Sequence, residues 1–254
     1  MKTIVTMGRG GTGKTTFVAL MAKYLMEKGE APILLVDADP DQNLAEMVGV
    51  DIETAGKKTI AELLAETFIR KGGTTVGVPP SQRIENRIWQ EGMYEGGDFD
   101  LIAVGTKWLE GCYCLPDAAL KNALQSVSRQ YRYILIDSPG GLEHLNRKIA
   151  GNVDVIIDVL GPSAKSFLHV KRARRVIDEV GIRYGRFVVA GGFAFPEQLA
   201  GTAGAATGAE YAGTIAADPD VAERVLGGRS LLDIPESSPA YVSAGRIVEN
   251  VIRQ

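Results

Sequence analysis

A glycine-rich stretch near the start of the chain carries the residue types that bind phosphate. Residues 8–16 read Gly-Arg-Gly-Gly-Thr-Gly-Lys-Thr-Thr and fit the spacing G-x-x-x-x-G-K-[S/T]. Glycines let successive backbone N–H groups turn toward phosphate oxygens, and the N-terminus of a following helix adds its dipole and free amides. Lys14 is expected to reach the β and γ phosphates of ATP, or the β phosphate of ADP, and the Thr15 hydroxyl is expected to ligate Mg²⁺. The residues expected to contact nucleotide are Gly10, Gly11, Thr12, Gly13, Lys14, Thr15 and Thr16.

A pair of carboxylates follows the second apolar run. The apolar residues 33–36 are followed by Asp37 and Asp39, in the arrangement D-x-D-P. Ligands of open α/β sheets bind outside the carboxyl ends of the strands, where such residues would stand. A carboxylate near the γ-phosphate suits the positioning of an attacking water. The spacing therefore favours a role for both residues in nucleotide chemistry over a simple acidic turn.

A later apolar run, residues 133–136, ends in Asp137 and then reads Ser-Pro-Gly-Gly. An apolar strand ending in aspartate places a carboxylate beside the phosphate-loop threonine and its Mg²⁺. Gly140 or Gly141 could offer a backbone N–H to the γ-phosphate, a contact that exists in the ATP state alone. This stretch is thus expected to act as a switch.

Two cysteines, Cys112 and Cys114, stand one residue apart. Two thiolates at this spacing can bind one soft or borderline metal ion, such as Ni²⁺ or Zn²⁺. A closed tetrahedral site needs four ligands, which a two-fold dimer would supply from two such pairs. The alternative is the chance proximity of two ordinary cysteines, and the spacing alone leaves both readings open.

The elements that must position these residues alternate along the chain. Continuous apolar runs, typical of strands covered on both faces, occupy residues 4–7, 33–36, 99–104, 133–136, 153–160, 187–190 and 211–215. Helices are expected over residues 14–29, 59–70, 117–130, 164–180, 219–227 and 240–252. This order predicts an α/β fold: a single doubly wound P-loop NTPase domain over residues 1–254, with a mostly parallel sheet and helices on both faces. Residues 71–97 are expected to form a surface excursion, and residues 191–208 favour neither helix nor strand.

Composition narrows the function classes. The chain has 254 residues with a formal net charge of −3, which supports neither general nucleic-acid binding nor attachment to an anionic membrane. No apolar run approaches the roughly 18 to 20 residues that span a bilayer. No secretory signal precedes the glycine loop, so the protein is expected in the cytoplasm, where its thiols stay reduced.

Taken in order, these motifs resemble the CooC family, the ATPases that insert nickel into carbon monoxide dehydrogenase. The resemblance rests on residues 8–16, residues 36–41, the cysteine pair and residues 137–145, where Gly-Leu-Glu-His-Leu follows the Asp-Ser-Pro-Gly run. The CooC family belongs to the deviant Walker A superfamily of MinD, ParA and nitrogenase iron proteins, whose loops carry a signature lysine where this chain has Arg9.

The resemblance implies a homodimer that closes on ATP and metal, with Cys112 and Cys114 of both protomers holding Ni²⁺ or Zn²⁺. It implies that Asp39 orients or activates the attacking water and that Asp37 helps to hold Mg²⁺ or its waters. By the same resemblance, Arg9 reaches across the interface to the partner's nucleotide. The client would be carbon monoxide dehydrogenase or a linked acetyl-CoA synthase.

Several features depart from the family pattern or stand outside it. The family's adenine-reading asparagine has no obvious counterpart, which leaves backbone groups or the region near Asp218 and Pro219 to contact the base. His144 could be a ligand or proton carrier in the switch, although a structural role is favoured; His169 lies in an expected helix without a signal of its own. The basic cluster at residues 171–175 is interpreted as a solvated helix face, with a docking patch for an acidic partner as the alternative.

Two other functions of the same superfamily compete with nickel insertion. The first is a partitioning or division-site ATPase, which needs a DNA-binding surface or a membrane-binding terminal helix. The second is an electron-transfer ATPase with an iron–sulfur cluster between subunits, although residues 138–147 contain no cysteine.

Overall fold

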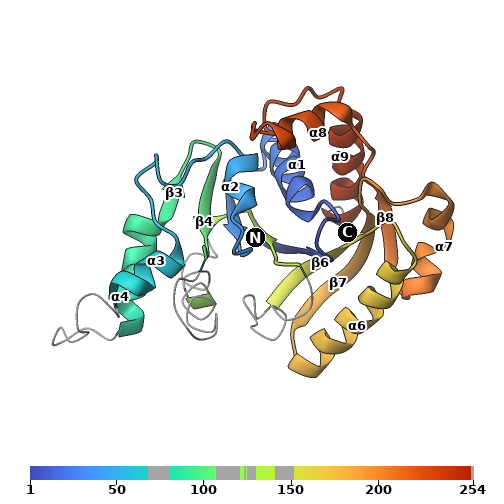
Figure 1. Cartoon of the computed structure of the whole chain (residues 1–254). Helices are drawn as coiled ribbons and strands as arrows, with labels where there is room; N and C mark the ends of the chain where they lie inside the picture. Colours follow the sequence, from blue (N-terminus) through green and yellow to red (C-terminus); the bar gives the residue numbers. More distant parts are fainter. Residues whose placement is uncertain (68–79, 107–120, 123, 125–129, 141–151, 253–254) are drawn as a thin grey trace.

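One eight-stranded sheet forms the centre of the protein (Figure 1). The structure is a computed structural model that describes residues 1–67, 80–106, 121–122, 124, 130–140 and 152–252. The strands are β1 (Lys2–Gly8), β2 (Ile33–Asp37), β3 (Met93–Glu95), β4 (Phe99–Ala103), β5 (Tyr133–Asp137), β6 (Asn152–Leu160), β7 (Arg183–Gly191) and β8 (Glu210–Thr214). Their order across the sheet is β3-β4-β2-β5-β1-β6-β7-β8. All neighbouring pairs are parallel except the edge pair of β3 with β4.

The first strand lies between two strands that come much later in the chain. In the parallel register, Thr6 of β1 stands opposite Asp137 of β5, and Met7 stands opposite Asp158 of β6. From β1 the chain runs to β2 on one side, and later it crosses from β5 to β6 on the other side of β1. This change of direction creates a crevice at the carboxyl ends of these strands. The candidate residues at the ends of β1, β2 and β5 meet there.

Helices α1 (Lys14–Glu27), α2 (Asn43–Met47), α8 (Pro219–Leu226) and α9 (Pro239–Ile252) pack against one face of the sheet. Most of α1 is buried, because α1 contacts the strands beneath it and has α9 beside it on the same face of the sheet (Figure 1). A helix enclosed in this way needs apolar residues around most of its circumference, as the run Phe-Val-Ala-Leu-Met-Ala supplies. The helix that follows the phosphate loop is thus held in the core by contacts around most of its circumference.

The opposite face carries two separate clusters. Helices α6 (Lys165–Val180) and α7 (Glu197–Thr207) cover β1, β6 and β7. Helices α3 (Ile60–Ala65) and α4 (Pro80–Arg87), with a π-helical turn, η2 (Ile88–Gly92), cover β2, β4 and β5. The predicted fold class, a mostly parallel sheet with helices on both faces, is confirmed.

Residues 80–95 correct the expected surface excursion. They form α4, η2 and β3, and Ile84, Ile88 and Met93 are buried in the core. The Arg87 guanidinium donates to carboxylate oxygens of Glu66 and Glu91, both at 2.6 Å, so polar side chains join these elements at their rim. The Gly- and charge-rich composition of the whole stretch concealed a few well-placed apolar residues.

The remaining helices agree with the sequence prediction at some positions and differ from it at others. Thr59 caps α3, with Glu62 completing a capping box, at the expected helix start. Residues 197–207, which had no assignment, form α7, whose small side chains let it approach α6 and β8 closely. The short helix α2 follows Gln42, a non-glycine residue with φ of 54°, and was not predicted. Most of the helix expected over residues 117–130 lies outside the described residues.

Among the described residues, no helix combines the length and apolar character needed to cross a bilayer.

Candidate phosphate-binding site

The glycine-rich stretch forms a loop between the end of β1 and the start of α1. The Thr12 hydroxyl donates a 3.0 Å hydrogen bond to the carbonyl oxygen of Arg9, which closes the loop on itself. The loop lines a cavity of about 470 Å³. The other lining residues come from the ends of β2 and β5 and from α2: Asp39, Asp41, Asn43, Met47, Pro139 and Gly140. The phosphate loop, the segment that carries Asp39 and the segment that follows β5 therefore meet at one cavity.

The residues that directly follow β7 pack closely against the phosphate loop. A Cβ atom added to Gly192 would lie 2.1 Å from the carbonyl oxygen of Thr12, and one added to Gly13 would lie 2.7 Å from the Phe193 ring. Gly13 also has φ of 90°, in the left-handed region that side chains disfavour. Gly192 and Phe193 are thus structural parts of the site that sequence reasoning missed, although Gly-Gly-Phe after an apolar run was the available signal.

Thr15 and Asp137 lie in direct contact. The Thr15 hydroxyl donates a 2.6 Å hydrogen bond to Oδ2 of Asp137, whereas Oδ1 is buried without a hydrogen-bond partner in the described chain. Burial raises the pKa of Asp137 to about 7, Asp39 adds to the rise, and the Thr15 hydrogen bond and Lys14 charge oppose it. A hydroxyl beside a carboxylate with a free oxygen is a donor set that suits Mg²⁺.

Asp37 organises the segment that carries Asp39. Its buried carboxylate accepts hydrogen bonds from the backbone N–H groups of Leu44, at 2.9 Å, and Asp39, at 3.2 Å. Burial raises the pKa of Asp37 well above its usual value, and the nearby Asp137 adds to the rise. Asp37 therefore holds the start of α2, while Asp39 is only partly buried and lines the cavity.

The two basic residues of the phosphate loop, Lys14 and Arg9, differ in how far they are exposed to solvent. Lys14 is 7% exposed, and its ammonium group donates to the carbonyl oxygen of Arg9 at 3.4 Å. The side chain of Arg9 is exposed. Gly140 lies against the loop, since an added Cβ would be 3.0 Å from the backbone nitrogen of Gly10. Lys14 thus faces the phosphate cavity from within, and Arg9 stands at the protein surface.

Several predicted residues contribute differently or lie elsewhere. Thr16 directs its hydroxyl to the sulfur of Met47 at 3.8 Å, which links α1 to α2. Asp218 caps α8 and accepts from the Ser238 hydroxyl, so its carboxylate is engaged in joining α8 to α9. Cys112, Cys114, Gly141 and His144 lie outside the described residues. Within the described part of the chain, no group of three or more His, Cys, Asp or Glu residues could hold a metal ion.

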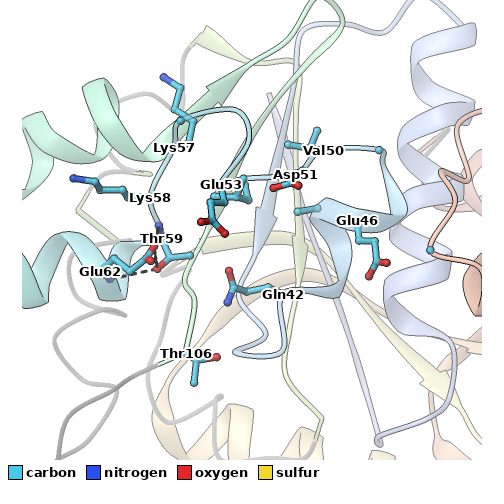
Figure 2. A pocket seen from close by; sticks show the side chains of 15 residues that line it. Gln42, Glu46, Val50, Asp51, Glu53, Lys57, Lys58, Thr59, Glu62 and Thr106 are labelled. Atoms are coloured by element: carbon cyan, nitrogen blue, oxygen red, sulfur yellow. Dashed lines mark hydrogen bonds between the residues drawn. The ribbon is translucent and has the colours of Figure 1, made fainter.

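A second, larger hollow of about 990 Å³ is lined in part by α2 (Figure 2). Its polar lining comes from α2, the segment that follows it, and the start of α3. Figure 2 shows Gln42, Glu46 and Glu53 around this space. Asn43 and Met47 of α2 line the phosphate cavity, whereas Ala45 and Glu46 line the hollow. The short helix is thus a wall common to both.

Comparison with known proteins agrees with this geometry. A family described as an AAA domain matches residues 1–181. An uncharacterized ATP-binding protein of Methanocaldococcus jannaschii is 30% identical, over 99% of this chain and 98% of the relative. The carbon monoxide dehydrogenase accessory protein CooC of Rhodospirillum rubrum is 28% identical over 72% of this chain and 71% of its own. A virulence plasmid ParA family protein of Chlamydia psittaci is 27% identical over 71% and 65%.

Solved structures share the fold at lower sequence identity. A ParA family ATPase from Chlorobium tepidum superposes with a TM-score of 0.73 at 16% identity, covering 98% of this chain and 99% of that one. The cell division ATPase MinD of Pyrococcus furiosus gives a TM-score of 0.71 at 20% identity, covering 100% and 99%. These similarities establish the architecture.

Proposed function

Since this chain belongs to the AAA-domain family that matches residues 1–181, it is an ATPase, and we propose that it works as an ATP-driven switch of the MinD and ParA type. The observation that carries this proposal is the meeting of the phosphate loop with Asp39 and Gly140 around one cavity. Segments that touch the γ-phosphate position can respond to its presence or loss.

The roles in hydrolysis follow from the positions of the side chains. Lys14 would bind the β and γ phosphates, and Asp39 would orient the attacking water from the partly buried rim of the cavity. Thr15 and Asp137 would hold Mg²⁺, either directly or through its waters. When bound, Mg²⁺ supplies positive charge that offsets the charge of the phosphates. Replacing Lys14 with alanine should abolish hydrolysis, whereas Lys171→Ala on α6 should leave the rate unchanged.

The switch acts as a homodimer in this proposal, with Arg9 as the residue that reaches the partner's nucleotide. Arg9 is exposed, and it directly follows β1. A guanidinium keeps the charge of the family's lysine and adds a planar fork that can bind two phosphate oxygens. ATP bound by one protomer would therefore be completed by the other.

We further propose that the cargo of this switch is nickel, bound as Ni²⁺ by Cys112 and Cys114 of two protomers and delivered to carbon monoxide dehydrogenase or a linked acetyl-CoA synthase. Zn²⁺ is the other ion that such a four-thiolate site accepts. Support comes from the Cys-x-Cys sequence and from the similarity to CooC over 72% of the chain. The two cysteines of one protomer are too few for a closed site, which couples metal binding to dimer formation.

The test is a titration of reduced protein with Ni²⁺ and with Zn²⁺, reading the mass in solution with and without ATP. One metal ion per dimer, lost in Cys114→Ser while ATP binding persists, is the expected result. Metal binding that survives in both Cys112→Ser and Cys114→Ser would place the ion elsewhere and overturn the cargo assignment.

A partitioning ATPase is the second candidate, favoured by the similarity to a plasmid ParA family protein over 71% of the chain. This candidate predicts an ATP-dependent dimer that forms without metal and binds DNA. Retention of linear DNA on a filter with ATP, and its loss with ADP, would support partitioning over nickel delivery.

A further inference from the structure

A buried carboxylate outside the described chemistry lies beneath the phosphate loop. Asp158 of β6 is 1% exposed and stands opposite Met7 in the parallel register. A Cβ atom added to Gly8, the first residue of the loop motif, would lie 3.3 Å from Oδ1 of Asp158. Asp158 is therefore placed at the foot of the loop, on the sheet face that α6 covers.

The partner that Asp158 faces is a histidine. Nε2 of His169 on α6 lies 3.9 Å from Oδ2 of Asp158, and the His169 side chain is 11% exposed. Within the described residues, neither carboxylate oxygen of Asp158 nor Nε2 of His169 has a hydrogen-bond partner. An isolated buried charge is costly, so two such groups side by side are stable when they share a proton.

The charges around this pair belong largely to the phosphate loop. Burial raises the pKa of Asp158 to about 7, and the charge of Lys14 opposes that rise. Burial lowers the pKa of His169, and the positive charges of Arg9, Lys14 and Arg172 lower it further. In the nucleotide-free protein, the loop cations thus disfavour a charged imidazolium beside Asp158.

Nucleotide phosphates bring negative charge to the same loop and offset the field of Lys14 and Arg9. Loss of that positive field favours an imidazolium at His169 paired with a carboxylate at Asp158. We propose that Asp158 and His169 are positioning residues that share a proton under the phosphate loop, and that nucleotide binding increases the pair's proton occupancy. The inference rests on nucleotide binding at the loop but not on the identity of any cargo.

The consequence is a measurable linkage between pH and nucleotide affinity. If binding takes up a proton, raising the pH weakens binding, and the logarithm of Kd rises by up to one per pH unit for each proton. A purely structural role for the pair would change Kd by a similar factor at every pH. The slope of log Kd against pH therefore separates proton linkage from damage to the fold.

The experiment titrates the full-length protein with the non-hydrolysed analogue AMPPNP and Mg²⁺ between pH 6.5 and 8.5 by calorimetry. At pH 7.5 it is repeated in PIPES and Tris, whose ionisation heats differ, so that proton uptake is counted directly. Wild type and the surface variant Arg175→Gln, on the same helix, should share one slope. His169→Gln and Asp158→Asn should both reduce it to the residual slope of the nucleotide itself.

The outcomes are distinct. If wild type, His169→Gln and Asp158→Asn show the same slope and the same proton count, the pair is not proton-linked and the proposal fails. Loss of the slope in one variant alone would overturn the shared-proton assignment. If Asp158→Asn does not fold, His169→Gln decides the question. Absence of AMPPNP binding in wild type would contradict nucleotide binding itself, a separate failure.

Discussion

The hydroxyl of Thr15 donates a 2.6 Å hydrogen bond to Oδ2 of Asp137, joining the first turn of α1 to the end of β5. These two residues are 122 positions apart in sequence, and several helices and strands separate α1 from β5 along the chain. The two oxygen groups meet because β5 pairs with β1, the strand that precedes the loop.

Replacing Thr15 with valine keeps the shape of the side chain and removes its hydroxyl. We expect kcat for ATP hydrolysis to fall by about 100-fold or more, the loss typical of removing one group that stabilises transition-state charge. The matched control is Thr15→Ser, which retains the hydroxyl and should keep most of the activity. Equal, near wild-type turnover in both variants would contradict the role of this hydroxyl.

The buried carboxyl of Asp137 makes stability depend on pH. Its pKa in the folded state is about 7, above its value of 3.8 in the unfolded chain. Between these values the folded state binds more protons, so this carboxyl lowers the free energy of unfolding as pH rises from about 4 to 7. Each pKa unit corresponds to about 1.4 kcal/mol.

Urea unfolding of metal-free wild type and Asp137→Asn at pH 5 and pH 8 measures this effect. The stability of wild type relative to the variant should be lower at pH 8 than at pH 5. Taking the difference cancels the contributions of carboxylates that both proteins share. A difference that is independent of pH would contradict the raised pKa.

Gly192 is predicted to be indispensable to the shape of the phosphate loop. A methyl group in Gly192→Ala would meet the carbonyl oxygen of Thr12 at 2.1 Å, which forces the loop to shift. We expect a stability loss of about 1–3 kcal/mol, as for other overpacked sites, together with weaker ATP binding. Gly201→Ala on α7 is the control, because nothing lies within 4 Å of its added Cβ. Calorimetric titration with ATP should separate the two variants.

Arg9 is predicted to serve hydrolysis more than binding. Its side chain is exposed, and the backbone carbonyl of Arg9, not its guanidinium, contacts Lys14 and Thr12. Arg9→Ala should therefore bind ATP with nearly wild-type affinity while kcat falls by about 1000-fold, as for other arginines supplied to a γ-phosphate. Arg9→Lys should recover part of the rate. A large loss of ATP affinity without a loss of kcat would exclude a role across an interface.

The unit formed by α3, α4, η2 and β3 can be tested through its core. Ile88 is 0% exposed, and Ile88→Ala should cost about 2–5 kcal/mol in the free energy of unfolding. Asn86→Ala, at an exposed position in α4, should change stability little. Denaturant melts of both variants would show whether residues 80–95 are integral to the fold.

The sequence was sufficient for features encoded by local spacing. The phosphate loop and α1 follow from one motif in which strand, turn and helix are contiguous, and the apolar run that ends in Asp137 is a second local motif. It was insufficient for α2, because five residues are too few to show helical periodicity. Two other contacts between distant segments were not predicted: the contact of Phe193 with Gly13 and the facing of Asp158 and His169, which depend on the packing of β6, β7 and α6.

The short helix α2 has one side in the phosphate cavity and the other in the larger hollow of Figure 2. Because α2 is a wall of both spaces, any displacement of the helix that widened one space would narrow the other. Thermodynamic reciprocity then applies. A molecule in the hollow that prefers one position of α2 changes the affinity for nucleotide by a certain factor, and nucleotide changes the affinity for that molecule by the same factor. A ligand of the hollow would therefore change nucleotide affinity without contacting the phosphate cavity.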